Sequence, residues 1–174
     1  MIGANIAPGL SRSFASEGWD FIDDDIWKEE RKRAFDAIDA KADLKIYASD
    51  IEGKAVKISI ENAAEAGTGD LIYFHRSDIK DALSKMEGEG GVIITNPPYG
   101  ERIGDEKDIA HIYDSLGRFM EDNKTWSLFM ITSDKDAEKK TLGRKADRRR
   151  KLYNGRMEVC YYQFHGERPA KKYE

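Results

Sequence analysis

The sequence has few of the residues on which disulfide frameworks and metal centres depend. Its 174 residues include one cysteine, Cys160, so an internal disulfide or a cysteine-rich metal site is excluded. The three histidines, His75, His111 and His165, are widely spaced in the sequence and give little support to a metal site. We therefore expect no metal in the function of this protein.

Long apolar runs are also lacking. No stretch approaches the roughly 20 apolar residues that a membrane-spanning helix needs, and the N-terminus has no charged-then-apolar signal pattern. Hydrophobic residues make up 40% of the chain and charged residues 36%, which is typical of a soluble globular domain. We therefore expect a single domain in the cytoplasm, without contact with a membrane.

The chain also lacks a positive net charge, since its formal charge is −4 at pH 7. Nucleic-acid binding stays open, because the distribution of charge matters more than its sum. The range 139–151 holds eight basic residues and one acid, Asp147. Such a run is usually a solvated face. The alternative is a patch that contacts phosphates, for which we single out Lys145, Arg148 and Arg149.

Short apolar segments alternate with helical patterns over most of the chain. The expected strands are Leu44 to Ala48, Leu71 to Phe74, Gly91 to Thr95 and Trp126 to Ile131. Apolar residues at helical spacing predict helices over 56–64, ending near Gly67, and over 109–120. The strand before Asn96 has three consecutive apolar residues, so we expect it to be buried on both faces. The βαβ order predicts a mainly parallel sheet with helices on both faces.

The two ends of the chain depart from this alternation. Asn154-Gly155 separates two strand-like segments, 151–153 and 156–164, and predicts a two-residue hairpin turn centred on that dipeptide. Near the start we expect a helix over 27–41, and Ile2 to Ile6 as the end of another that stops around Pro8-Gly9. The fold class is therefore α/β, with a C-terminal antiparallel hairpin.

Asn96-Pro97-Pro98-Tyr99 follows directly after a strand, where α/β sheets bind ligands. Two prolines fix φ and remove two amide donors, which stiffens the loop. The Asn96 side-chain oxygen and the Pro97 carbonyl can accept hydrogen bonds from an amino group and stabilise positive charge on its nitrogen. Tyr99 offers a flat face for a base taken out of its stack. We interpret these four residues as catalytic; the alternative is a plain proline-rich turn.

This motif resembles the catalytic motif of the methyltransferases that act on amino groups of adenine or guanine. The longer strings NPPYGERIG, NIAPGLSRSFASEGW and RKLYNG resemble a narrower family, the bacterial large-subunit ribosomal RNA guanine methyltransferases. The resemblance implies a Rossmann-like fold and transfer of methyl from S-adenosylmethionine to the exocyclic amine of guanine in 23S ribosomal RNA. Two alternatives stay open: a DNA adenine methyltransferase, which the short motif alone allows, and a non-catalytic RNA-binding fragment.

The resemblance also implies a role for two acids and their neighbours. Asp50 matches the acid that binds the ribose hydroxyls of the cofactor, and Ile51 the residue against its adenine ring. Asp78, followed by Ile79, matches the acid that receives the adenine amino group, and Asn96 completes the expected cofactor site. Without the resemblance, each aspartate is an ordinary helix-cap or turn residue.

A glycine-rich turn between the first strand and the first helix is required for a cofactor site of this class, and none is found. Gly67-Thr68-Gly69 and Gly88 to Gly91 each precede a strand instead of following one. The resemblance places Ile2 to Pro8 at the end of the first helix. We therefore expect 1–174 to be a partial methyltransferase domain, with the first strand, its glycine loop and an RNA-binding THUMP domain before Met1.

That arrangement has a physical consequence for the sheet. The absent strand belongs between the strand that ends at Asp50 and the strand that ends at Thr95, so two inner strands lose a partner. Buried unpaired backbone groups are costly and bare strand edges invite pairing. We expect these strands to pair directly, or another chain or segment to fill the gap. A gap that stays open should be unstable in solution. We also expect weak cofactor binding and self-association.

Overall fold

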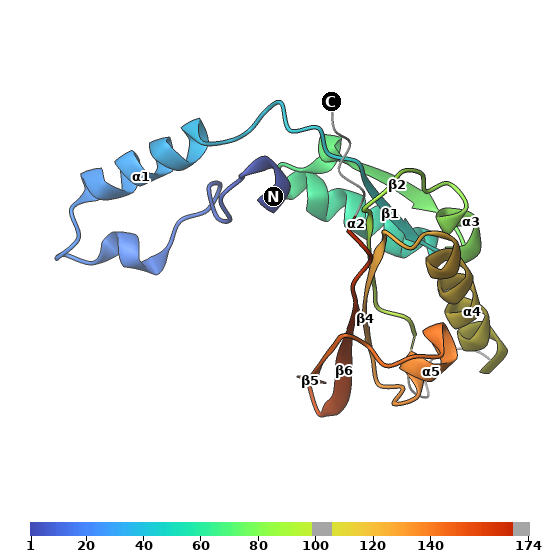
Figure 1. The fold of residues 1–174 in the computed structure, drawn as a ribbon. Coiled ribbons are helices and arrows are strands. Elements are labelled where there is room, and N and C mark those ends of the chain that lie inside the picture. Colours follow the sequence, from blue (N-terminus) through green and yellow to red (C-terminus); the bar gives the residue numbers. More distant parts are fainter. Residues whose placement is uncertain (99–105, 169–174) are drawn as a thin grey trace. The chain divides into compact units, whose positions relative to one another are not determined.

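The computed structural model describes residues 1–98 and 106–168. Figure 1 shows strands and helices alternating along the chain, which confirms the α/β order expected from the sequence. The contacts divide the chain into two compact units, Met1–Arg76 and Ser77–Glu174.

The first unit holds a two-stranded parallel sheet. Its elements are α1 (Asp24–Asp36), β1 (Ile46–Asp50), α2 (Gly53–Glu65), β2 (Ile72–Arg76) and three short 3-10 helices, Ile2–Ala4, Ala15–Gly18 and Gly69–Leu71. β1 and β2 are paired in parallel from Ile46 opposite Ile72 to Asp50 opposite Arg76. The crossover between them is α2, as a parallel pair requires.

Near the start of the chain, one expected helix has other bounds and one expected helix end is a single turn. The helix expected over 27–41 is α1, which ends at Asp36 and begins earlier because the Asp23 side chain caps it by accepting the backbone N–H of Asp25 at 3.0 Å. The segment expected to end a helix is a single 3-10 turn, Ile2–Ala4. It stops at Asn5, whose φ of 52° is left-handed and cannot continue a helix.

The second unit holds a four-stranded sheet. Its elements are α3 (Ile79–Leu83), β3 (Val92–Thr95), α4 (Glu106–Asp122), β4 (Ser127–Thr132), α5 (Ala137–Leu142), β5 (Arg148–Asn154) and β6 (Met157–Phe164). The strand order is β3-β4-β6-β5, in which β3 and β4 are parallel and the other two pairings are antiparallel. The expected C-terminal antiparallel hairpin is confirmed.

The turn of this hairpin lies one residue later than expected. Asn154 pairs with Met157, so the two turn residues are Gly155 and Arg156. In the described part of the chain Asn5 is the only residue other than glycine with positive φ, whereas Gly155 has a φ of 61°. Positive φ at the first turn residue alone fits a type II′ turn, in which glycine takes the first central position.

The core of the second unit lies on one face of its sheet. Aromatic and aliphatic side chains of α4, β4 and β6 form it, with Leu83 and Ala137 beside them: Tyr113, Leu116, Met120, Trp126, Leu128, Met130, Tyr162 and Phe164. Ile93 of β3 packs against this core, but Val92 and Ile94 are 55% and 80% exposed. The expectation that this strand is buried on both faces was wrong, because strand alternation turns Val92 and Ile94 away from the face that α4 covers.

β1 and β3 each have one strand partner in their own unit. Within the described residues, β1 pairs with β2 and β3 pairs with β4. Direct pairing of β1 with β3 stays a prediction. One edge of β1 and one edge of β3 have unpaired backbone groups in this part of the chain, which is the condition that invites pairing with another strand.

Close packing between α4 and α5 gives a prediction about stability. A Cβ atom at Gly117 of α4 would lie 2.3 Å from the backbone carbonyl oxygen of Thr141 in α5. Gly117→Ala should lower the free energy of unfolding by about 2 kcal/mol, since overpacking outweighs the better helix propensity of alanine. Gly53→Ala in α2 is the matched control, because its Cβ would meet only ordinary contact at 3.5 Å. Urea denaturation measures both; equal stability of the two variants would contradict this packing.

Candidate active site at the strand ends

The first candidate cofactor group lies in the turn between β1 and α2. Asp50 ends β1, and its Oδ1 accepts the backbone N–H of Glu52 at 2.7 Å. Arg76 at the end of β2 donates from Nε to the carbonyl oxygen of Ile51 at 3.0 Å. Ile51 is 62% exposed beside the exposed carboxylate. No described residue hydrogen-bonds Asp50 Oδ2, so the turn presents one acceptor oxygen and an apolar side chain.

The second candidate cofactor group caps α3 in the other unit. Asp78 Oδ1 accepts the backbone N–H of Lys80 at 2.8 Å and lies 3.2 Å from Nε2 of His111 on α4. Partial burial raises the pKa of Asp78, but the hydrogen bonds from Lys80 and His111 outweigh it, so the pKa of this carboxyl is lowered. Asp78 is therefore an ionised acceptor at neutral pH, beside the half-buried Ile79.

His111 is a residue of this site that sequence reasoning missed. From the sequence, we consider His111 only as a metal ligand, whereas its Nε2 lies 3.2 Å from Asp78 Oδ1. The two residues are 33 positions apart, and only the packing of α3 against α4 brings them together. No motif in the sequence signals such a contact.

The motif that we interpret from the sequence as catalytic begins where β3 ends. Asn96 is exposed directly after Thr95, Pro97 is buried and Pro98 is half-buried. Within the described residues, the Asn96 side chain has no hydrogen-bond partner, so its amide oxygen is available to a ligand. Buried Pro97 anchors the backbone just behind this amide. Tyr99 lies outside the described residues, so the expected stacking platform has no structural description.

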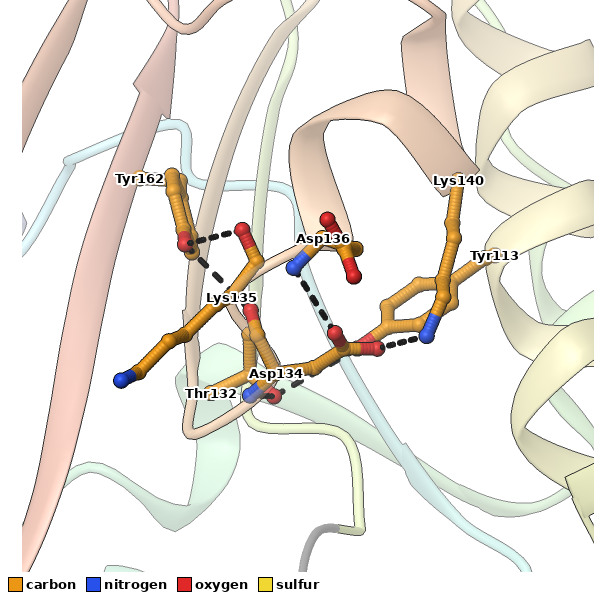
Figure 2. Close-up of polar contacts among 7 residues, drawn as sticks. All are labelled: Tyr113, Thr132, Asp134, Lys135, Asp136, Lys140 and Tyr162. Atoms are coloured by element: carbon orange, nitrogen blue, oxygen red, sulfur yellow. Dashed lines mark hydrogen bonds and ion pairs between the residues drawn. The ribbon is translucent and has the colours of Figure 1, made fainter.

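The loop after β4 lies beside this motif, because β3 and β4 are parallel neighbours. Figure 2 shows a polar cluster that holds the loop, made of Tyr113, Thr132, Asp134, Lys135, Asp136, Lys140 and Tyr162. The Tyr162 hydroxyl contacts the backbone carbonyls of Asp134 and Lys135 at 3.3 and 3.5 Å. The Tyr113 and Thr132 hydroxyls are 3.4 Å apart. Buried side chains from α4 and β6 thus hold the backbone of the loop that follows β4.

Asp134 is the charged centre of this cluster. Its carboxylate accepts the backbone N–H of Asp136 at 2.9 Å and pairs with Lys140 Nζ at 2.7 Å (Figure 2). Burial raises the pKa of Asp134, but the bonds from Lys140 and Asp136 outweigh it and the pKa is lowered. Burial raises the pKa of Tyr113 to about 12, so its hydroxyl stays protonated next to the ionised carboxylate.

These shifts predict how stability depends on pH. A carboxyl whose pKa is lower in the folded state than in the unfolded state stabilises the fold at pH values above its unfolded pKa. That contribution is lost as the pH falls through the folded pKa. Asp134→Asn should therefore lower the free energy of unfolding by about 1 kcal/mol at pH 7, a figure discounted for partial exposure. The difference from wild type should shrink below about pH 4.

Urea titrations at pH 7 and at acidic pH measure this difference. Asp114→Asn is the matched control, because its i,i+4 pair with Arg118 is exposed (74% for Arg118 and 54% for Asp114) and should contribute little. A difference for Asp134→Asn that stays constant as the pH falls would show that the charge of Asp134 is not what stabilises the loop.

The basic run over 139–151 extends from α5 through the loop after it into the edge strand β5. Four of its basic residues pair with acids within the described part of the chain: Lys140 with Asp134, Arg144 with Asp147, Arg149 with Glu138 and Lys151 with Glu158. The remaining four, Lys139, Lys145, Arg148 and Arg150, have no acidic partner there. Of the expected RNA contacts, Lys145 and Arg148 are therefore free of ion pairs in the described residues, whereas Arg149 is not.

Arg150 was missed because the strand was expected to begin at Lys151. The structure begins β5 at Arg148, and alternation then places Arg148 and Arg150 on the same face. Recognising the strand at its true start would have separated this pair from Arg149.

No described group of three or more histidine, cysteine, aspartate or glutamate residues is placed to hold a metal ion. No helix in the described ranges is long and apolar enough to span a bilayer.

Comparison with known proteins identifies the family of this chain. The family model described as UPF0020, RMKL-like methyltransferase domain, matches residues 1–163. A candidate RNA methyltransferase of Bacillus subtilis, YpsC, is 43% identical over 99% of this chain and 44% of its own length. Ribosomal RNA large subunit methyltransferase K/L of Shewanella baltica is 36% identical over 92% of this chain and 23% of its own. The chain thus spans less than half the length of these relatives.

Solved structures extend the comparison to the fold. SMU.472, described as a candidate methyltransferase and crystallised with S-adenosylhomocysteine, has a TM-score of 0.86 at 42% identity, over 97% of this chain and 44% of its own. A Listeria monocytogenes protein described as a predicted N6-adenine-specific DNA methylase has a TM-score of 0.82 at 38% identity, over 95% of this chain and 42% of its own. The fold is that of the Rossmann-like S-adenosylmethionine methyltransferases, and this chain belongs to the RMKL-like methyltransferase domain family.

Proposed function

We propose that this chain is the part of an S-adenosylmethionine-dependent methyltransferase that methylates the exocyclic amine of guanine in 23S ribosomal RNA. The observation that carries the proposal is the exposed Asn96, held by buried Pro97 directly after the parallel strand β3. The Shewanella baltica relative, named as a ribosomal RNA large subunit methyltransferase, supports RNA as the substrate. Ribosomal RNA also implies the cytoplasm.

The residues present fit S-adenosylmethionine on the chemistry of their side chains. Asp50 offers a free carboxylate oxygen for ribose hydroxyls, with the exposed Ile51 as an apolar surface for the adenine ring. Asp78 is an ionised acceptor for the adenine amino group, with Ile79 beside it. The SMU.472 structure, solved with S-adenosylhomocysteine, supports the same cofactor for this family. Bound S-adenosylmethionine would supply an electrophilic methyl group on a sulfonium.

The chemistry left to the protein is orientation and charge stabilisation. Asn96 Oδ1 and the Pro97 carbonyl accept the N–H groups of the target amine, which directs the nitrogen lone pair at the methyl carbon. Transfer would form a nitrogen–carbon bond and break the carbon–sulfur bond of the bound cofactor, and the electron pair of the broken bond would stay on sulfur. The same two acceptors stabilise the positive charge on nitrogen until it loses a proton to water. Pro98 stiffens the loop, and Tyr99 is proposed to stack on the base.

Two other functions remain in competition. The Listeria monocytogenes neighbour favours a DNA adenine methyltransferase, since adenine also presents an exocyclic amine to the same acceptors. A non-catalytic RNA-binding chain is favoured by the absence, from this sequence, of a glycine-rich turn that follows a strand. Binding of labelled S-adenosylmethionine separates the non-catalytic RNA-binding chain from the two methyltransferases. The identity of the methylated nucleoside separates the RNA guanine methyltransferase from the DNA adenine methyltransferase.

We also propose that the basic run contacts RNA through Lys145, Arg148 and Arg149, with unequal contributions. Lys145 and Arg148 have no acidic partner among the described residues and can neutralise phosphates directly. Arg149 already pairs with Glu138, 3.5 Å away, so part of its charge is compensated. Phosphate contacts of this kind give salt-dependent affinity without sequence information. Replacing all three residues by alanine should flatten the salt dependence of RNA binding, and an unchanged slope would make the run a plain solvated face.

A further inference from the structure

The register of the β5–β6 hairpin sorts its basic side chains by face. Arg148 lies opposite Gln163 and Arg150 opposite Tyr161, so these four side chains share one face of the sheet. Arg149 lies opposite Tyr162, a residue of the buried core, and therefore faces the other way. A cluster of basic residues adjacent in sequence is thus divided between two surfaces.

The charges on the two faces differ in what they already contact. On the core-facing side, Arg149 pairs with Glu138, and Lys151 pairs with Glu158 at 2.6 Å. On the opposite face, Arg148 and Arg150 have no ion pair with any described residue, and both are exposed. Their Cα atoms are about 6.7 Å apart, as alternate residues of a strand are. Two free guanidinium groups in a row suit successive phosphates of an extended strand.

An aromatic surface lies next to these two arginines. Tyr161 is half-buried and stacks on Phe129 of β4, with ring centroids 6.2 Å apart and an angle of 24° between the planes. Phe129 in turn contacts the ring of His165 edge-on at 5.6 Å. The Tyr161 ring is therefore held in place, with part of its surface open to solvent. A fixed aromatic beside free cations is the arrangement with which proteins bind unpaired bases.

We propose that this face of β5–β6, here called the Arg148–Tyr161 face, binds a single-stranded segment of RNA. Arg148 and Arg150 hold consecutive phosphates, and one base stacks against Tyr161. The inference rests on the proposed RNA function and adds to it the conformation of the substrate and a contact surface separate from Asn96. A duplex fits poorly, because its bases are stacked on one another and offer no free face to Tyr161.

The charged half of the proposal is tested by fluorescence anisotropy of a labelled single-stranded RNA oligonucleotide with the full chain across a salt series. Arg148→Gln with Arg150→Gln should reduce the slope of log affinity against log salt by about 1.4, since each single-strand phosphate contributes about 0.7. The matched control is Arg144→Gln with Lys151→Gln, which removes equal charge from residues that already pair with Asp147 and Glu158 and should leave the slope unchanged. Equal loss in both double variants would overturn the proposal.

The aromatic half is tested with Tyr161→Leu and Tyr161→Phe. Leucine keeps an apolar side chain against Phe129 but cannot stack, and should weaken single-stranded RNA binding by about 5- to 150-fold. Phenylalanine should restore binding, and a duplex of the same length should bind no better to wild type than to Tyr161→Leu. Circular dichroism confirms that each variant is folded.

The outcomes distinguish this inference from the proposed function. Single-stranded RNA binding that none of these variants alters overturns the Arg148–Tyr161 face and leaves methyl transfer to guanine untouched. A wild-type chain that binds no RNA at low salt overturns both the face and the RNA contacts proposed above. Loss of binding in both the charge and the stacking variants, with the control unaffected, supports the face.

Discussion

Replacing Asn96 by alanine is expected to lower the rate of methyl transfer by a factor on the order of 100 to 1,000. The amide oxygen is proposed to accept the N–H of the target amine and to stabilise charge that appears only in the transition state. Its loss should therefore reduce kcat and kcat/KM together and leave the affinity for S-adenosylhomocysteine within about twofold. Single-turnover transfer of a labelled methyl group and calorimetric titration measure the two quantities.

The experiment uses a chimaera with the Bacillus subtilis relative, because the match spans 44% of the length of that protein. In the chimaera, this chain replaces the 173 matched residues. Asn123→Ala is the matched control, because the amide of Asn123, directly after α4, donates to the carbonyl of Phe119 in that helix and has no proposed role in transfer. A fall in cofactor affinity equal to the fall in rate would mean that Asn96 binds the cofactor and does not act on the amine.

The isolated chain is expected to self-associate, and to bind S-adenosylhomocysteine at least an order of magnitude more weakly than the chimaera. Val92 and Ile94 lie 55% and 80% exposed on β3, and β3 has one edge without a partner among the described residues. Exposed apolar strand faces with bare edges promote association between chains. Sedimentation velocity over a concentration series measures the association.

Ile94→Lys should shift the chain towards the monomer, because it places a charge on this strand face without removing a buried side chain. The matched control is Ile58→Lys on α2, which changes an isoleucine that is 46% exposed and outside any sheet. If the two variants reduced self-association equally, the association would be due to exposed apolar side chains in general and not to the face of β3. A wild-type chain that stays monomeric and binds the cofactor tightly would contradict both this prediction and the expected partial cofactor site.

The sequence predicted those features that depend on neighbouring residues. The strand before Asn96 and the helix over 109–120 follow from local hydrophobic periodicity, and β3 and α4 occupy these places. The catalytic motif was visible for the same reason, since its four residues are consecutive. The start of β5 was not predictable in this way, because a run of arginines is more typical of a solvated face than of a strand.

Features that depend on distant parts of the chain could not be predicted. The contact between His111 and Asp78 requires α3 and α4 to pack together, and no local pattern specifies that packing. The exposure of Ile94 could not be predicted either, because it also depends on distant segments. Three consecutive apolar residues indicate a strand with two covered faces, but whether a second layer of helices is present depends on other segments. Residues of the cofactor site were assigned by resemblance for the same reason.

The proposal that this chain methylates guanine in ribosomal RNA is tested most directly by identifying the modified nucleoside. The chimaera is incubated with labelled S-adenosylmethionine and 23S ribosomal RNA that lacks the modification, and the RNA is digested and separated by chromatography. We predict label in N2-methylguanosine, and none when the chimaera carries Asn96→Ala. Label in N6-methyladenosine, or no label from the chimaera when the intact relative gives it, would contradict the account.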